Sequence, residues 1–234
     1  MKKFISILLA AVLCLSFGTT AFAAEKDTSA VKEFNFAQYL ESHKIVSRDD
    51  FLNVIKKYGN ETAVESIESC KDDFSAYKGS DCKESFSYTI DYDNQLIYTD
   101  TTVKKDVVKE SGAKATTYVT TASTQHEAYS WCGVHVFTVS TDGSFTRQAG
   151  SSCSVRTSHG YFNPAFLSLW NASTWINTGN YNTKKAYIDT YGTANLNLAV
   201  AQVLGITLNI QSVNYSLTLN CDSYGNVTAS YSQS

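Results

Sequence analysis

The chain lacks an excess of positive charge. Its 234 residues contain 19 Lys and Arg against 22 Asp and Glu, which gives a formal net charge of −3. Loss of Lys2 and Lys3 with the leader described below removes two positive charges and leaves −5. A surface of this sign does not attract the phosphates of nucleic acids or the headgroups of anionic lipids. We therefore expect no nucleic-acid partner.

Motifs for metal binding and catalysis are also missing. No two of the four histidines have the spacing of a helical zinc site, and the sequence contains no C-x-x-C. It has no G-x-S-x-G, and residues 122–234 hold only four acidic residues from which a glycoside hydrolase would need a converging pair. Cys132 with His135 or His159 offers a Cys–His pair, but strand-like surroundings lack the helix amino terminus that usually activates such a thiol. We expect no catalytic residue, no metal and no cofactor.

Long apolar runs are absent except at the start of the chain. Lys2 and Lys3 precede the almost wholly apolar residues 4–17, and Ala21-Phe22-Ala23 has small residues at the positions that a signal peptidase reads. The run is too short to cross a bilayer as a helix. We expect residues 1–23 to be a signal peptide of bacterial form, cleaved before Ala24. The mature protein is then secreted and soluble, in a compartment where disulfides persist.

Charge divides the remainder into two parts. Residues 25–84 hold 9 basic and 13 acidic residues, whereas residues 122–234 hold only four of each. Dense alternating charge is typical of solvated helices, and a surface of Ser, Thr, Asn and Tyr is typical of exposed antiparallel sheet. The sequence predicts an acidic helical segment over 24–84 and an antiparallel β domain over 85–234.

The helical segment has clear boundaries. Ser47 precedes Asp50 by three residues, as in a capping box, and Gly59 follows an apolar stripe at the position of a left-handed helix cap. A second helix is expected from Glu61 and a shorter one over 36–43. Such a segment is a cap on the β domain, a small adaptor, or a pro-segment that is removed later.

The β domain begins where the hydrophobic period changes to two, at Ser85. Eight to ten strands follow, with the charged residues 104–114 as a linker or a hairpin tip. The fold class is therefore α+β, mainly β: a small N-terminal helical segment followed by an antiparallel β-sandwich or barrel.

Two cysteines are placed symmetrically about a turn signal. Asp142-Gly143 is a preferred two-residue hairpin turn, and pairing about it opposes residues whose numbers sum to 285. Cys132 and Cys153 satisfy that sum, so we predict a disulfide between them unless a bulge, for instance at Gly150, shifts the register.

The other cysteines of the mature chain allow a second disulfide. Cys70 and Cys82 are joined by a short polar segment and form the natural pair. Cys221 is then left over, either as a small buried residue of an apolar strand or as a reactive thiol or intermolecular link.

A long alternation runs over residues 194–210, with apolar residues at even positions and Asn and Thr at odd ones. It predicts a hairpin with one apolar face. That face builds the core of the β domain, or it inserts into a membrane as in a membrane-active toxin or bacteriocin-like protein.

Aromatic residues gather in the β domain, including all three tryptophans. Residues 170–182 are loop-like and set Trp170, Trp175 and Tyr181 among Asn, Ser and Thr. Such side chains suit contact with sugars or protein surfaces, although Trp170 and Trp175 also fit a core. We expect an exported, non-catalytic binding protein whose partner is a carbohydrate or a protein at the cell surface. The alternatives are the membrane-active protein and, third, a secreted hydrolase.

Overall fold

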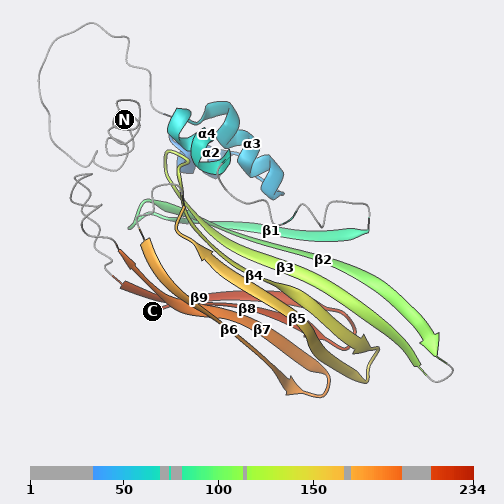
Figure 1. Ribbon diagram of the computed structural model, residues 1–234. Helices are drawn as coiled ribbons and strands as arrows, with labels where there is room; N and C mark the ends of the chain where they lie inside the picture. Colours follow the sequence, from blue (N-terminus) through green and yellow to red (C-terminus); the bar gives the residue numbers. More distant parts are fainter. Residues whose placement is uncertain (1–33, 69–73, 75–80, 113–114, 166–169, 197–211) are drawn as a thin grey trace, which may run out of the picture.

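The computed structural model describes residues 34–68, 74, 81–112, 115–165, 170–196 and 212–234 (Figure 1). Within these ranges, three short helices precede nine strands. The elements are α2 (Phe36–Ser42), α3 (Arg48–Tyr58), α4 (Glu61–Glu68), β1 (Cys82–Asp91), β2 (Leu96–Gly112), β3 (Ala115–Ser130), β4 (His135–Gln148), β5 (Ser152–Asn163), β6 (Trp170–Asn182), β7 (Lys185–Leu196), β8 (Ser212–Asp222) and β9 (Val227–Gln233). Within this described part, no helix is long and apolar enough to span a membrane.

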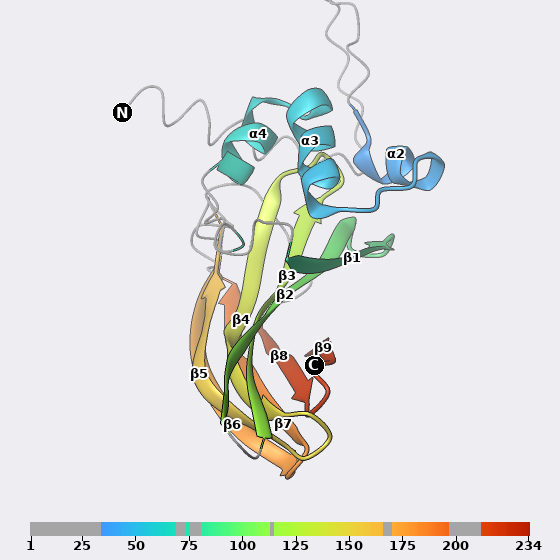
Figure 2. The ribbon, with the colours of Figure 1, turned by 90° about the vertical axis from the view of Figure 1, so that its right-hand side faces the viewer.

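The strands form two antiparallel sheets that follow chain order. The first sheet has the order β1-β2-β3-β4-β5 and the second has the order β6-β7-β8-β9. The chain passes from one sheet to the other between β5 and β6, so the sheets lie face to face as a sandwich (Figures 1 and 2). The α+β, mainly β fold class expected from the sequence is confirmed.

The helix α3 begins and ends where its capping residues predict. Ser47 Oγ accepts a hydrogen bond from the backbone N–H of Asp50 at 3.1 Å, which satisfies one of the unpaired donors at the start of α3. Gly59 does not adopt the expected left-handed conformation, since its φ is −67°. A side chain there would instead strike the carbonyl oxygen of Ile55, so glycine is needed for close packing and not for backbone freedom.

Apolar residues from both sheets meet between them. Leu217 and Leu219 of β8 and Ile188 of β7 are almost completely buried against residues of β3 and β4 such as Ala128 and Phe145. Burial of each large aliphatic side chain stabilises the fold by about 1.5–3 kcal/mol. In the described part of β7 and β8, the apolar side of the alternation therefore faces the protein core.

The helical segment packs on the outer side of the first sheet. Phe51 and Ile55 of α3 share one buried cluster with Ile97 and Tyr129 of the sheet, and the N–H of Phe36 donates to the carbonyl of residue 131 at 2.9 Å. Figure 2 shows the helices gathered at one end of the sandwich. The segment thus packs as a cap on the β domain.

The predicted turn at Asp142-Gly143 is wrong. β4 runs without interruption through both residues, and the chain turns only after Gln148. A Cβ atom on Gly143 would clash with the carbonyl of Thr157 and the side chain of Ile188, so this glycine permits close approach of the second sheet.

The Cys132–Cys153 disulfide is wrong for the same reason. Cys132 lies in the turn before β4, whereas Cys153 pairs with Arg147 at the far end of that strand. At about 3.3 Å per residue, the run from His135 to Arg147 measures roughly 40 Å. In the second predicted pair, Cys82 carries a free thiol and Cys70 lies outside the described residues.

Three further segments differ from expectation or fall outside the description. Residues 104–112 are part of β2, which pairs with β3 as far as Gly112 and Ala115, so of the two alternatives the linker is wrong and the end of a hairpin is confirmed. Residues 170–182 are not a loop but the strand β6. Of the predicted 194–210 hairpin, residues 197–211 lie outside the described part, and Ala194 is buried in the core.

Candidate binding surface

The side of the second sheet that faces away from the first carries a set of exposed side chains, which we call the outer face. In β7 the even-numbered residues, such as Ile188, point into the core, so the odd-numbered ones lie on the outer face. Strand register then places Trp175 opposite Tyr191, Asn177 opposite Asp189, and Gly179 opposite Tyr187.

Aromatic rings form two pairs on this face. The rings of Trp175 and Tyr191 lie 6.0 Å apart between centroids, and those of Tyr181 and Tyr187 lie 4.9 Å apart. Trp175 is 52% exposed and Tyr181 is 59% exposed. Lys185 extends its ammonium group over the Tyr181 ring, 5.3 Å from the centroid. Large aromatic surfaces left open to water in this way commonly mark a contact site.

A carboxylate lies between the two aromatic pairs. The hydroxyls of Ser216 and Thr218 both donate to Oδ1 of Asp189, at 2.7 and 3.1 Å. Among the described residues nothing bonds to Oδ2 of Asp189, which is thus available as an acceptor. The amide of Asn177, opposite Asp189, donates to the hydroxyl of Tyr187 at 3.4 Å. The outer face therefore alternates ring surfaces with hydrogen-bonding groups along the β6–β7 ribbon.

The structure separates the three aromatic residues that the sequence grouped together. Trp175 and Tyr181 lie on the outer face, but Trp170 is buried in the core cluster between the sheets. Sequence reasoning missed Tyr187, Asp189 and Tyr191. Their alternation with apolar residues was a usable signal, but their position beside Trp175 follows only from the strand register.

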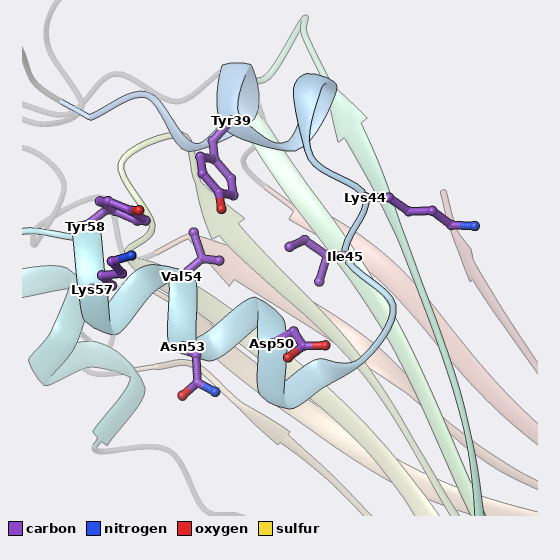
Figure 3. Close-up of a pocket in the computed structure, with 8 residues that line it drawn as sticks. All are labelled: Tyr39, Lys44, Ile45, Asp50, Asn53, Val54, Lys57 and Tyr58. Atoms are coloured by element: carbon purple, nitrogen blue, oxygen red, sulfur yellow. The ribbon is translucent and has the colours of Figure 1, made fainter.

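A shallow groove lies apart from this surface, in the helical segment (Figure 3). It has a volume of about 310 Å³ and is lined by Tyr39, Lys44, Ile45, Asp50, Asn53, Val54, Lys57 and Tyr58. Its acid, Asp50, already accepts a hydrogen bond from Ser47 at 2.7 Å. A hydrogen bond with the Tyr58 hydroxyl raises the pKa of Lys57, so this lysine stays charged. The groove brings together no acid–base pair and no metal-binding set.

The structure gives Cys132 and its two candidate histidine partners other contacts. Cys132 Sγ lies 3.1 Å from the hydroxyl of Ser130, while the ring of His135 bonds to Thr138 at 2.7 Å. Burial lowers the pKa of His135 and favours its neutral form. His159 lies on β5 and faces Asp142 at 3.4 Å. In the described ranges no three His, Cys, Asp or Glu residues form a metal-binding group.

Comparison with models of protein families, with curated proteins and with solved structures gave no match. The function of the outer face is therefore inferred from its geometry and chemistry alone.

Proposed function

We propose that this protein is an exported, non-catalytic binding protein that holds a polysaccharide chain on the outer face of the β6–β9 sheet. The observation that carries the proposal is the exposed Trp175–Tyr191 ring pair. The Asp189 carboxylate lies two residues from Tyr191 on β7, on the same face.

Sugars need two kinds of contact, and the outer face supplies both. The C–H side of a pyranose ring is weakly positive and stacks on the negative face of an aromatic ring. Its hydroxyl groups donate to carboxylate oxygens and accept from amide groups. Trp175 and Tyr191 offer the first contact, and Asp189 Oδ2 with the nearby amide of Asn177 offers the second.

The spacing of these groups favours a chain over a single sugar. Tyr187 and Tyr191 stand four residues apart on β7, or about 13 Å along the strand. A small ligand needs a concave site for most of its surface to be buried, whereas the exposed rings of the outer face follow one another along the β6–β7 ribbon. A linear polymer instead lies along a flat ribbon and contacts both aromatic pairs together.

The test is retention of the purified protein on insoluble polysaccharides: cellulose, chitin, starch granules and peptidoglycan. We expect retention on at least one of them and a loss of about 30-fold in affinity for Trp175→Ala, because an aromatic contact at the centre of an interface contributes about 2 kcal/mol. Tyr92→Ala is the matched control, since Tyr92 is also exposed but lies between β1 and β2, beside Trp131. Its affinity should equal that of the unmodified protein.

Two other results would overturn the proposal. One is absence of retention on every polysaccharide together with capture of a surface protein that Trp175→Ala releases, which would make the outer face a protein interface. The other is prompt release of dye from liposomes, with no sugar binding, which would favour the membrane-active alternative.

A further inference from the structure

Two buried cysteines from different sheets lie together at one end of the sandwich. Cys153 is on β5 in the first sheet and Cys221 is on β8 in the second, and both belong to one core cluster with Phe145 and Ile188. They are 2% and 0% exposed, and both carry free thiols in the structure.

Backbone hydrogen bonds bring the two cysteine segments close together. The N–H of Cys153 donates to the carbonyl of Thr183 at 2.9 Å, and the N–H of Ser223 donates to the carbonyl of the adjacent Lys184 at 2.8 Å. Thr183 and Lys184 form the β6–β7 turn, so this turn is hydrogen-bonded both to the segment of Cys153 and to the segment that follows Cys221. The backbones of two packed sheets usually stand about 10 Å apart. The direct backbone hydrogen bond between Cys153 and the β6–β7 turn requires roughly half that distance at this end of the sandwich.

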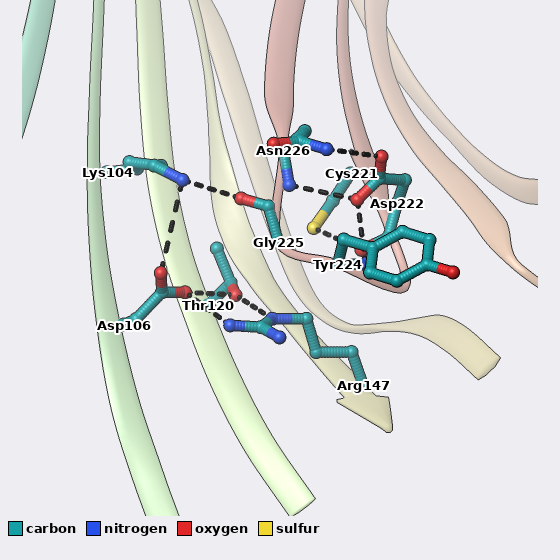
Figure 4. Close-up of polar contacts among 9 residues, drawn as sticks. All are labelled: Lys104, Asp106, Thr120, Arg147, Cys221, Asp222, Tyr224, Gly225 and Asn226. Atoms are coloured by element: carbon teal, nitrogen blue, oxygen red, sulfur yellow. Dashed lines mark hydrogen bonds and ion pairs between the residues drawn. The ribbon is translucent and has the colours of Figure 1, made fainter. Parts of the chain in front are cut away.

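Polar contacts hold the same end closed (Figure 4). Arg147, which pairs with Cys153, donates to Thr120 at 2.7 Å and to Asp106 at 3.2 Å. Lys104 donates to the carbonyl of Gly225 at 2.6 Å, which fixes the β8–β9 turn against the first sheet. The two cysteines are thus positioned by their surroundings before any bond joins them.

The thiols interact directly. A hydrogen bond between them lowers the pKa of Cys153 and raises that of Cys221, and Cys221 Sγ also lies 3.5 Å from the carbonyl oxygen of Asp222. Cys153 also accepts from the backbone of Ala186, the residue that pairs with Cys221. Both sulfurs therefore lie beside Ala186, within the reach of a disulfide.

The other described cysteines are too distant from Cys153 to compete for it. Cys132 is roughly 40 Å away along β4. Cys82 begins β1, which is separated from β5 by four strand spacings, or about 19 Å.

We infer that Cys153 and Cys221 form a disulfide that joins the two sheets when the protein folds under oxidising conditions. Cys153 thiolate attacks a disulfide-bearing oxidant, forms a mixed disulfide and releases one thiol. Cys221 thiolate then attacks the Cys153 sulfur and releases the second thiol. The two cysteines lose two protons and two electrons, and the oxidant's disulfide is reduced. Because both sulfurs are buried in the folded protein, the mixed disulfide forms before β5 and β8 pack together, and their packing then brings Cys221 to it.

The inference is tested by refolding the reduced full chain with oxidised glutathione as the oxidant, followed by alkylation in denaturant and tryptic mapping without reductant. Cys153 is the sole cysteine of peptide 148–156 and Cys221 is the sole cysteine of peptide 186–234. We expect these peptides to be linked, and Cys132→Ser to leave the linkage unchanged. Alkylation of both cysteines, or linkage of either one to Cys82 or Cys132, would overturn the inference.

Thermal unfolding supplies a second readout. The cross-link closes a loop of about 68 residues, so its removal from a chain of this size should lower Tm by roughly 8–16 °C. We expect that loss on comparing the oxidised protein with Cys153→Ser/Cys221→Ser. Equal Tm values would contradict the inference, and the peptide map decides the question if the double variant does not fold. Neither measurement involves a glycan, so a failure here is distinct from a failure of the proposed function.

Discussion

The helical cap is joined to the β domain by a buried ion pair, and this pair yields a prediction with a distinctive pH dependence. The guanidinium of Arg48 donates through two nitrogens to both carboxylate oxygens of Glu127, each at 2.8 Å. Tyr129 donates to the same carboxylate at 3.1 Å. Burial by itself raises the pKa of Glu127, but the charge and hydrogen bonds of Arg48 outweigh it and hold the pKa below its usual value.

Arg48→Met removes the cation and leaves Glu127 buried in the interface. The carboxyl then becomes protonated, because an isolated buried charge costs more than taking up a proton. The usual pKa of a glutamate carboxyl, 4.5, lies 2.5 pH units below pH 7. At 1.36 kcal/mol per unit, protonation of Glu127 at pH 7 therefore costs about 3.4 kcal/mol. That figure lies within the range of about 3–5 kcal/mol observed when one partner of a buried pair is removed.

The same reasoning predicts a much smaller loss in acid. At pH 5 the cost of protonation falls to about 0.7 kcal/mol, because the solution lies only half a pH unit above 4.5. Relative to the unmodified protein, Tm should therefore fall by roughly 7–14 °C at pH 7 but by less than about 3 °C at pH 5. The assay is thermal unfolding at both pH values, followed by circular dichroism.

Two variants serve as controls. Arg48→Met/Glu127→Leu replaces both partners with apolar side chains and should recover most of the lost stability at pH 7. Glu84→Gln changes an exposed acid that also contacts Arg48 and should alter stability by less than about 1 kcal/mol. An equal loss at the two pH values in Arg48→Met, or no loss at pH 7, would refute the reasoning.

Two further predictions concern stability. Burial lowers the pKa of His135 below 6.5. The stability that comes from its neutral form is therefore complete above pH 6.5 and is lost as the pH falls through the pKa of the folded protein. The free energy of unfolding in denaturant should accordingly decrease from about pH 7.5 to about pH 5.5, and His135→Gln should flatten this dependence. Gly143→Ala should destabilise the protein by about 1–3 kcal/mol, because the added methyl group meets Ile188 and the backbone of Thr157. Gly179→Ala, whose added methyl group would meet only the flexible Tyr187 side chain, is its control; similar urea midpoints for the two variants would contradict the packing explanation.

Much of the fold could be predicted because local patterns and the final packing agree. The hydroxyl of Ser47 caps α3 as its spacing from Asp50 predicts. The alternation of Leu217 and Leu219 with polar residues correctly predicts a strand with one buried face. In such segments each short stretch of sequence carries its own structural information.

The failures arise where packing overrides a local signal or removes it. Asp142-Gly143 has the composition of a turn, but Gly143 serves the approach of Ile188 from the other sheet. β6 is an edge strand, and most of its side chains are exposed on both of its faces. Its sequence, residues 170–182, therefore shows no alternation of apolar and polar residues and resembles a loop. The neighbours of Trp175 and of Cys153 depend on strand register and on the contact between sheets, which no single segment of sequence encodes.

The most direct test of the outer face as a glycan-binding surface is a nuclear magnetic resonance titration of the indole N–H signals. The protein has three tryptophans, and the indole nitrogens of Trp131 and Trp170 are buried, whereas the Trp175 side chain is half exposed. Titration with soluble oligosaccharides from the polysaccharide that retains the protein should shift the Trp175 signal and leave the other two unchanged. Shifts confined to Trp131 or Trp170, or an unmoved Trp175 signal at saturating sugar, would contradict binding at the outer face.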